Sequence, residues 1–201
     1  MFSQGAFEML SSNCFRLVLI GPRGAGKSSV ADVVAHRCGL PLYKLDAHCF
    51  ELYKADDRSA KAARDVGEFS APQLLARIFS RFADDLAEDW LAYQESLHLV
   101  AVKLALEKAV APILDRGSEH CSYITSDNQG CLVRLLWLHP VLCLWPRRDL
   151  SRGAALLPGR NCRSLAFNKA ALHLHRGREI AKHVIDVEKK GINDIANEAI
   201  A

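Results

Sequence analysis

Nine residues near the N-terminus combine glycines, a lysine and two serines at a spacing that suits a phosphate ligand. The stretch is Gly21-Pro22-Arg23-Gly24-Ala25-Gly26-Lys27-Ser28-Ser29, which matches the pattern G-x-x-x-x-G-K-[ST] at every fixed position. Glycines allow positive φ angles and close backbone approach. The freed N–H groups can then point inward and surround an anion. The sequence therefore predicts a phosphate-binding loop whose binding residues are Gly21, Gly24, Ala25, Gly26, Lys27, Ser28 and Ser29.

The lysine and the first serine of this loop supply a charge and a metal ligand. Lys27 would reach the β- and γ-phosphates, and the Ser28 hydroxyl would bind Mg²⁺ together with phosphate oxygens. An ordinary glycine-rich turn with an N-capping serine is the alternative, and it explains Gly26 and Ser28. It leaves Lys27 unexplained, because a lysine in the first helical turn opposes the helix dipole unless an anion binds there.

The loop needs a strand before it and a helix after it, and the chain supplies both. Residues 15–20 predict a buried strand, and a helix begins at Lys27 or Ser28 and ends at Gly39. Further strands are expected at 40–46, 112–115, 141–145 and 183–187. Helices are expected at 54–65, at 70–110 with a break near Asp89, and at 192–200. Strands alternating with helices indicate an α/β fold with a parallel sheet covered on both faces.

The long helical region carries apolar residues at helical spacing. They are Leu74, Leu75, Ile78, Phe82 and Leu86 in its first part, and Leu97, Val100 and Leu104 in its second. We expect these two stripes to face the core.

Composition limits the class of protein. With 201 residues and 22.2 kDa, a single domain spanning 1–201 is expected. The net charge is only +3 and the basic residues form no long run, so the sequence gives no clear nucleic-acid partner. No apolar run reaches the roughly 18 residues that a membrane span needs. Residues 1–13 lack a signal-peptide pattern, and the seven cysteines lack CxxC spacing, so we expect reduced thiols in a cytoplasmic protein.

Two aspartates follow predicted strands, where ligands gather in open α/β sheets. Asp115 ends an apolar run, as a Walker B acid would, and could hold Mg²⁺. Its alternative is a surface turn. Asp46 ends the second predicted strand and could orient or deprotonate an acceptor hydroxyl. Its alternative is a helix N-cap.

The region after the fourth predicted strand is rich in arginine. Arg147, Arg148 and Arg152 could neutralise a moving phosphoryl group from a lid, or could lie in a solvated basic loop. The whole stretch 117–165 holds six arginines and no lysine. A translated frameshift and a basic lid with a hydrophobic strand both remain open for it. His173 and His175 are two residues apart, which does not suit a helical metal pair.

With these residues in place, the chain resembles the shikimate kinase family of nucleoside-monophosphate-kinase-like P-loop proteins. The resemblance rests on the loop, on Leu45-Asp46-Ala47-His48, on Asp65-Val66-Gly67-Glu68-Phe69, and on the stretch from Glu179 to Val187. It covers about the first 70 residues and the last 30. Only the phosphate loop is highly specific, and many other families share it.

The resemblance implies a five-stranded parallel sheet in the order 2-3-1-4-5, ATP as donor, Mg²⁺, a small hydroxylated acceptor and a lid at about 147–165. Asp46 matches the first acid of the family's D-x-D, while His48 stands at the second. The family's glycine-rich turn is reduced to Gly117, and no arginine stands near Ser70, where the family binds a carboxylate. The acceptor half of the site therefore departs from the family pattern.

Two functions are carried forward. In the first, the chain is an ATP-dependent small-molecule kinase with Lys27, Asp46 and Arg152 as catalytic residues, Ser28 and Asp115 at the metal, and Asp46 and Gly117 at the acceptor. In the second, it is a degenerate P-loop protein that binds nucleotide without phosphorylating anything. A monomer is expected in both.

Overall fold

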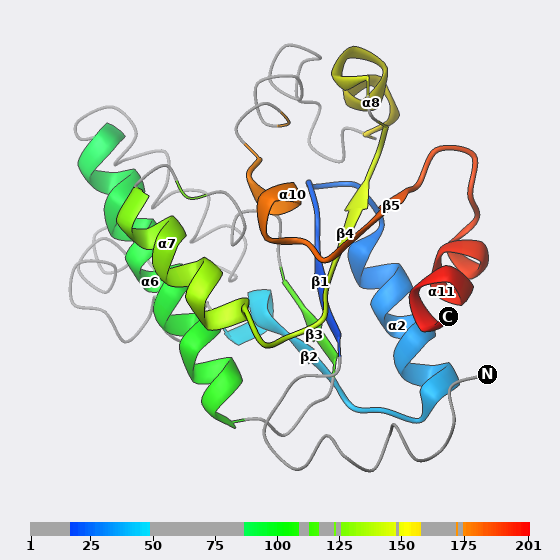
Figure 1. Ribbon diagram of the computed structural model, residues 1–201, viewed down its shortest axis with the longest axis horizontal. Helices are drawn as coiled ribbons and strands as arrows, with labels where there is room; N and C mark the ends of the chain where they lie inside the picture. The colour runs from blue at the N-terminus through cyan, green and yellow to red at the C-terminus, as the bar shows by residue number, and fades with distance from the viewer. Residues whose placement is uncertain are drawn as a thin grey trace, which may run out of the picture.

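A five-stranded parallel sheet forms the centre of the protein (Figure 1). The computed structural model describes residues 17–48, 87–108, 113–116, 123, 126–147, 149–157, 172 and 175–201. The strands are β1 (Leu17–Ile20), β2 (Leu42–Lys44), β3 (Ile113–Asp115), β4 (Val141–Trp145) and β5 (His183–Asp186). Their order is β2-β3-β1-β4-β5, and all four pairings are parallel. The expected fold class and strand order are therefore confirmed.

The central strand β1 is buried on both faces, which explains its continuous apolar sequence. It pairs with β3 on one side and with β4 on the other, so that Val18 lies beside both Leu114 and Val141. Val18 and Ile20 pack into one core cluster, and Leu19 packs into a second on the opposite face. This alternation divides the molecule into three layers.

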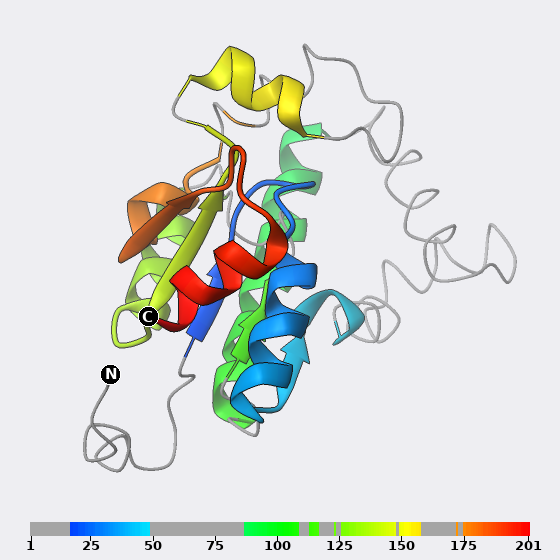
Figure 2. The same ribbon diagram turned by 90° about the vertical axis from the view of Figure 1, so that its right-hand side faces the viewer.

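Helices cover the two faces of the sheet. Helices α2 (Lys27–Cys38) and α11 (Ile192–Ile200) pack on one face, where Val30, Val34 and Ile195 are buried (Figure 2). Helices α6 (Ala87–Lys108) and α7 (Ser126–Leu136) pack on the other, together with α8 (Leu150–Leu156) and α10 (Gly177–Ile180). Since α2, α6 and α7 run antiparallel to the strands, their first turns lie toward the carboxyl ends of the strands (Figure 1).

The apolar stripe expected in the second part of the long helix is wrong. Val100 is 47% exposed and Leu104 is only partly buried, and nothing is described for the side chain of Leu97. The buried face of α6 instead carries Glu95, His98, Ala101, Val102 and Ala105. The alanines on this face are small and allow close helix packing, and Glu95 and His98 are polar although they are buried. A prediction from hydrophobicity alone therefore selects the wrong face of α6.

Helix α6 begins at Ala87, two residues before Asp89, and the residues before it lie outside the described part of the chain, so the break expected near Asp89 is not tested. One other boundary differs from expectation. Strand β2 ends at Lys44, and residues 45–48 form a short helical turn. Asp46 therefore lies in this turn and is not, as the sequence had predicted, the last residue of the strand. The expected helix at 54–65 and the stripe at 74–86 lie outside the described residues.

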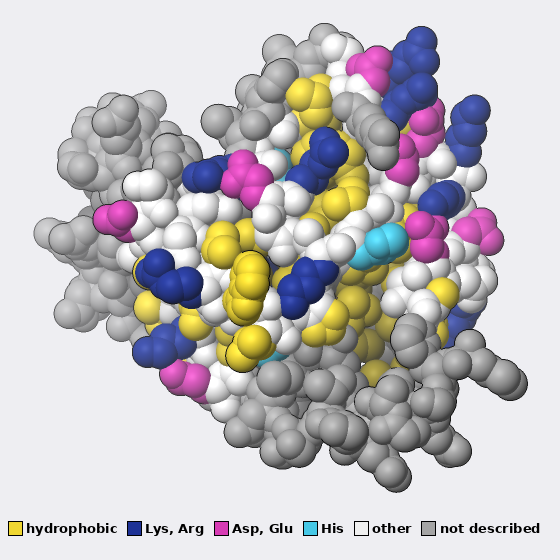
Figure 3. All heavy atoms as spheres, in the orientation of Figure 1, with side chains coloured by type: hydrophobic (Ala, Val, Ile, Leu, Met, Phe, Trp, Pro, Cys, Tyr) yellow, Lys and Arg dark blue, Asp and Glu magenta, His cyan; other side chains and the backbone are white. Residues whose placement is uncertain are grey.

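The arginine-rich stretch 117–165 supplies α7, β4 and α8. Every residue of β4 is buried, and β4 lies between β1 and β5. A segment that supplies an inner strand favours the native sequence over a frameshift. In the part of the chain described, no helix is both long and apolar enough to span a membrane. On the face shown in Figure 3, Lys and Arg side chains are scattered among acidic and hydrophobic ones.

Candidate functional site

The phosphate loop connects β1 to α2, and three of its glycines have positive φ angles. The angles are +146° at Gly21, +84° at Gly24 and +85° at Gly26. A Cβ atom on Gly21 would lie 2.3 Å from the carbonyl oxygen of Leu144 in β4, so a side chain cannot fit there. Gly26 occupies the N-cap of α2 in the left-handed conformation. The loop therefore has the backbone form that an anion-binding nest requires.

Lys27 folds back over this loop. Its Nζ donates a hydrogen bond of 2.9 Å to the carbonyl oxygen of Pro22, and the side chain is buried. No acidic residue stands in the first turn of α2 to offset its charge. The ammonium group and the N-terminus of α2 together form an electropositive site suited to phosphate.

Asp115 lies beside this site at the end of β3. Its carboxylate is buried, interacts with the Ser28 hydroxyl, and lies near the charge of Lys27. Burial raises the pKa of Asp115, while the Ser28 hydrogen bond and Lys27 act in the opposite direction. Its Oδ1 atom has no hydrogen-bond partner among the described residues.

The donor set fits a magnesium ion shared with a phosphate. Asp115 and Ser28 offer hard oxygen ligands, and a buried carboxylate oxygen is available. The described residues contain no cluster of three or more His, Cys, Asp or Glu that could hold a metal without a ligand. A magnesium ion held by Asp115 and Ser28 would thus need phosphate oxygens and water as its remaining ligands.

An ion pair missed by the sequence analysis borders Asp115. Lys44 at the end of β2 lies 2.9 Å from Asp32 on α2, and both charges act on Asp115. Asp32 follows Ser28 by one helical turn, and that spacing could have identified it.

A buried histidine supports the loop from the opposite face of the sheet. His175 lies just before α10, its Nδ1 accepts a 3.1 Å hydrogen bond from the Gly177 N–H, and its ring meets the edge of Trp145. It also interacts with the backbone of Gly21. Burial and the nearby charges of Lys27 and Arg116 lower its pKa to about 4, so the ring is neutral at pH 7. Sequence spacing gave no sign of this role.

The acceptor residues expected from sequence are only partly described. Asp46 is exposed in the turn after β2, and His48 stacks on Tyr43 with ring centroids 4.0 Å apart. Gly117 lies outside the described residues. Leu45, directly before Asp46, packs into the core cluster under α6 and α7.

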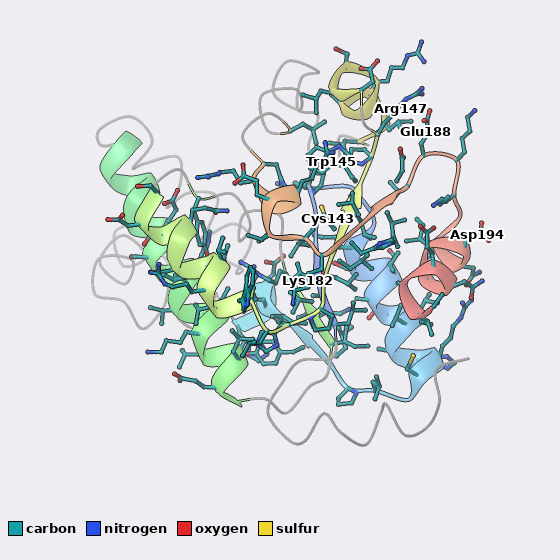
Figure 4. The ribbon with its side chains drawn as sticks, in the orientation of Figure 1. Cys143, Trp145, Arg147, Lys182, Glu188 and Asp194 are labelled. Carbon is teal, nitrogen blue, oxygen red and sulfur yellow. The ribbon has the colours of Figure 1, made fainter. Side chains whose placement is uncertain are left out.

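The lid arginines take different places. Arg152 lies exposed on α8, 3.9 Å from Asp149. Arg147, after β4, forms an ion pair with Glu188, after β5, as Figure 4 shows. Arg178 lies over the Trp145 ring, 5.3 Å from its centroid, and Arg148 lies outside the described residues.

Three solved structures with 15–17% identity to this chain share its fold. The shikimate kinase from Acinetobacter baumannii, solved with shikimate, is 17% identical with a TM-score of 0.57, over 98% of this chain and 94% of that one. The shikimate kinase from Aquifex aeolicus is 15% identical with a TM-score of 0.55, over 92% and 94%. That from Bacteroides thetaiotaomicron is 15% identical with a TM-score of 0.53, over 92% and 95%.

Sequence comparisons alone give no relative. No protein-family model matches the chain, and no curated protein matches its sequence. The strand order, the loop between β1 and α2, and these structural similarities agree. The chain therefore has the P-loop kinase fold of the shikimate kinases.

Proposed function

We propose that the protein is an ATP-dependent kinase that transfers the γ-phosphoryl group to a hydroxyl of a small metabolite. One observation carries this proposal: the electropositive loop around Lys27 lies beside a buried, partly unsatisfied Asp115 at the carboxyl edge of a parallel sheet. That edge is where ligands bind in open α/β folds. The fold shared with shikimate kinases supports the same reading.

The donor half of the site would act by charge and position. The N–H groups of residues 21–29 would hold the triphosphate, and Lys27 would exchange its Pro22 contact for phosphate oxygens. Ser28 and Asp115 would hold Mg²⁺, which would supply positive charge to neutralise the phosphates. Arg152 on α8 would approach from the lid, since its side chain is exposed and α8 lies beyond the carboxyl end of β4 in Figure 1.

The acceptor half would centre on Asp46. Its carboxylate lies beyond the end of β2 and would orient the acceptor hydroxyl and accept its proton. The family resemblance also proposes Gly117, which follows β3 in the sequence and lies outside the described residues, as an acceptor contact. Apart from the proton that Asp46 accepts, these groups position and polarise the reactants, so most of the rate gain would come from orientation and electrostatics.

The first prediction concerns Lys27. Replacing Lys27 with Ala should lower ATP turnover by about 10²–10³-fold, because a preorganised cation at the transferring phosphoryl group is lost. Turnover would be measured with Mg²⁺ over a panel of hydroxylated acceptors. Lys103→Ala, an exposed lysine on α6, is the control and should keep wild-type turnover. Full activity in the Lys27 variant would disprove the mechanism.

A nucleotide-binding protein without transfer activity is the second candidate. The departures at His48 and Gly117 favour it, since they affect the acceptor half and leave the loop intact. Calorimetric titration with ATP and Mg²⁺ separates the two. Binding that depends on Lys27, with no phosphorylated product from any acceptor, would support the second candidate.

A further inference from the structure

Strand β5 lies at one edge of the central sheet, as Figure 2 shows. The strand order ends with β5, and β4 is its only pairing partner among the described strands. The Val187 N–H, directly after β5, donates to the Trp145 carbonyl oxygen in β4. Because backbone groups along a strand alternate between its two sides, the N–H and C=O groups of Val184 and Asp186 point away from β4. Within the described structure, the outer edge of β5 is therefore available to another strand.

Apolar side chains are exposed beside this edge. Ile185 is buried in the core cluster under α2 and α11, so the neighbouring Val184 faces the side of the sheet that α6 and α7 cover. Val184 is 39% exposed there. Trp137, in the turn that follows α7, is 69% exposed, and its carbonyl oxygen accepts a 2.6 Å hydrogen bond from Lys182 Nζ just before β5. Val184 and Trp137 thus provide apolar surface next to the outer edge of β5.

Charges of opposite sign flank Val184 on this side of the sheet. Lys182 lies before β5 and contacts the turn after α7 (Figure 4), and Asp186 ends the strand two residues after Val184. Both charged side chains are exposed. Asp186 accepts a hydrogen bond from the Glu188 N–H, and neither Asp186 nor Lys182 forms an ion pair with another described residue. The segment therefore has a basic start, an apolar centre and an acidic end.

This order of side chains is complementary to itself when two copies of the strand run antiparallel. With a two-fold axis at Val184, the two valines lie opposite each other, and Lys182 of each copy lies opposite Asp186 of the other. Opposite charges and β-branched residues in directly opposed positions stabilise a strand pair. A register shifted by two residues would place Val184 opposite Asp186 and lose both kinds of pair. The side chains therefore select one register.

We infer that the outer edge of β5 is a self-association surface, through which two copies of this chain form an antiparallel dimer centred on Val184. The sheet would then continue from one copy into the other, and Trp137 would lie beside the end of the second copy's strand. The inference is independent of the proposed kinase function. It differs from the monomer expected from the sequence.

The oligomeric state of the full chain tests this surface first. Pairing through one short strand buries little area, so the dissociation constant of the dimer should be on the order of 10–100 μM. Sedimentation equilibrium over about 5 μM to 1 mM protein covers that range. A reductant is included, because Cys38 is exposed and could cross-link copies. A monomer at every concentration overturns the inference.

Charge reversal tests the register. Lys182→Asp and Asp186→Lys should each raise the dissociation constant by about tenfold or more, because each turns two attractive pairs into two repulsive ones. The variant that carries both changes should return to within about threefold of the wild type, since opposite charges again face each other. The double change restores neither the Trp137 nor the Glu188 contact within one copy, so recovery must come from pairing between copies.

A matched control and a second measurement complete the test. Lys103→Asp makes the same change in charge on exposed α6 and should leave the dimer unaffected. Amide hydrogen exchange at Val184 should slow as the wild-type concentration rises, because its outward N–H becomes hydrogen-bonded in the dimer. Thermal unfolding shows whether each variant is folded. In folded variants, a dimer that single reversals leave intact, or that the double reversal fails to restore, overturns the inference, as does concentration-independent exchange at Val184.

Discussion

At the scale of single residues, two glycines of the phosphate loop are required for different physical reasons. At position 21 the backbone of β4 leaves no room for a side chain, since a Cβ on Gly21 would lie 2.3 Å from Leu144 O. Gly26 has open space around its Cβ position but has a φ of +85°. Close approach determines the first position and backbone conformation the second.

Gly21→Ala should therefore destabilise the protein by about 2 kcal/mol or more, because neither neighbouring backbone can move freely. Gly130→Ala offers a control of opposite sign. Gly130 lies inside α7, its nearest contact would be 3.6 Å away, and alanine there should stabilise by about 0.5–1 kcal/mol. Urea unfolding of both variants measures the difference, and equal effects would contradict this account.

His175, which contacts the phosphate loop, makes the free energy of unfolding depend on pH. Its folded-state pKa of about 4 lies below its ordinary value of 6.5, so the unfolded chain binds a proton that the folded protein excludes. The associated stability is present above pH 6.5, falls as the pH drops from 6.5 to 4, and changes no further below 4. The total loss should be about 3 kcal/mol.

His175→Gln should lack this part of the acid destabilisation, since glutamine does not titrate. Denaturant unfolding of the variant and the wild type at several pH values between 4 and 7 measures it. His183→Gln removes an exposed histidine and should behave like the wild type. A wild-type curve parallel to that of His175→Gln would show that His175 does not titrate in this window.

At the scale of elements, α8 depends on its cap. Asp149 accepts hydrogen bonds from the N–H groups of Ser151 and Arg152 at 2.9 and 3.1 Å, and these bonds hold the pKa of Asp149 below its usual value. With only seven residues, α8 has few other internal contacts that fix its start.

Asp149→Ala should loosen α8, because two N–H groups lose their acceptor. Hydrogen exchange of residues 150–156 would report the change. Asp149→Asn keeps a capping oxygen and should retain most of the protection. If Arg152 acts from α8, the alanine variant should also lower ATP turnover while the asparagine variant preserves it.

At the scale of the whole molecule, β4 joins the two core clusters. Cys143 and Trp145 pack on the α6 and α7 face, and Leu142 and Leu144 pack on the α2 and α11 face. A defect in β4 should therefore affect both layers at once. One cooperative unfolding transition is therefore predicted for a chain that forms a single domain.

Leu144→Ala should destabilise the protein by about 2–5 kcal/mol, with tryptophan fluorescence and circular dichroism reporting one common transition. Leu138→Ala is the control, since Leu138 is 76% exposed just before the same strand. Two separate transitions in the Leu144 variant would contradict the single domain.

Local sequence patterns were sufficient to predict the phosphate loop, the strands around it and the α/β class. These features depend on local rules: glycine spacing, continuous apolar strands, and a C-terminal glycine at Gly39 that ends α2. The position of Asp115 beside Ser28 followed as well, since strand ends meet at one edge of a parallel sheet.

The three-dimensional packing was needed to identify which groups face one another across elements. It placed His175 beside Gly21, paired Lys44 with Asp32, and turned Glu95 and His98 inward while Val100 faces solvent. Helical periodicity indicates an apolar face, but the approach of α7 selects the buried one. The phosphate loop is therefore local in sequence, whereas Asp115 and His175 reach it only through the packing of the sheet and the segment before α10.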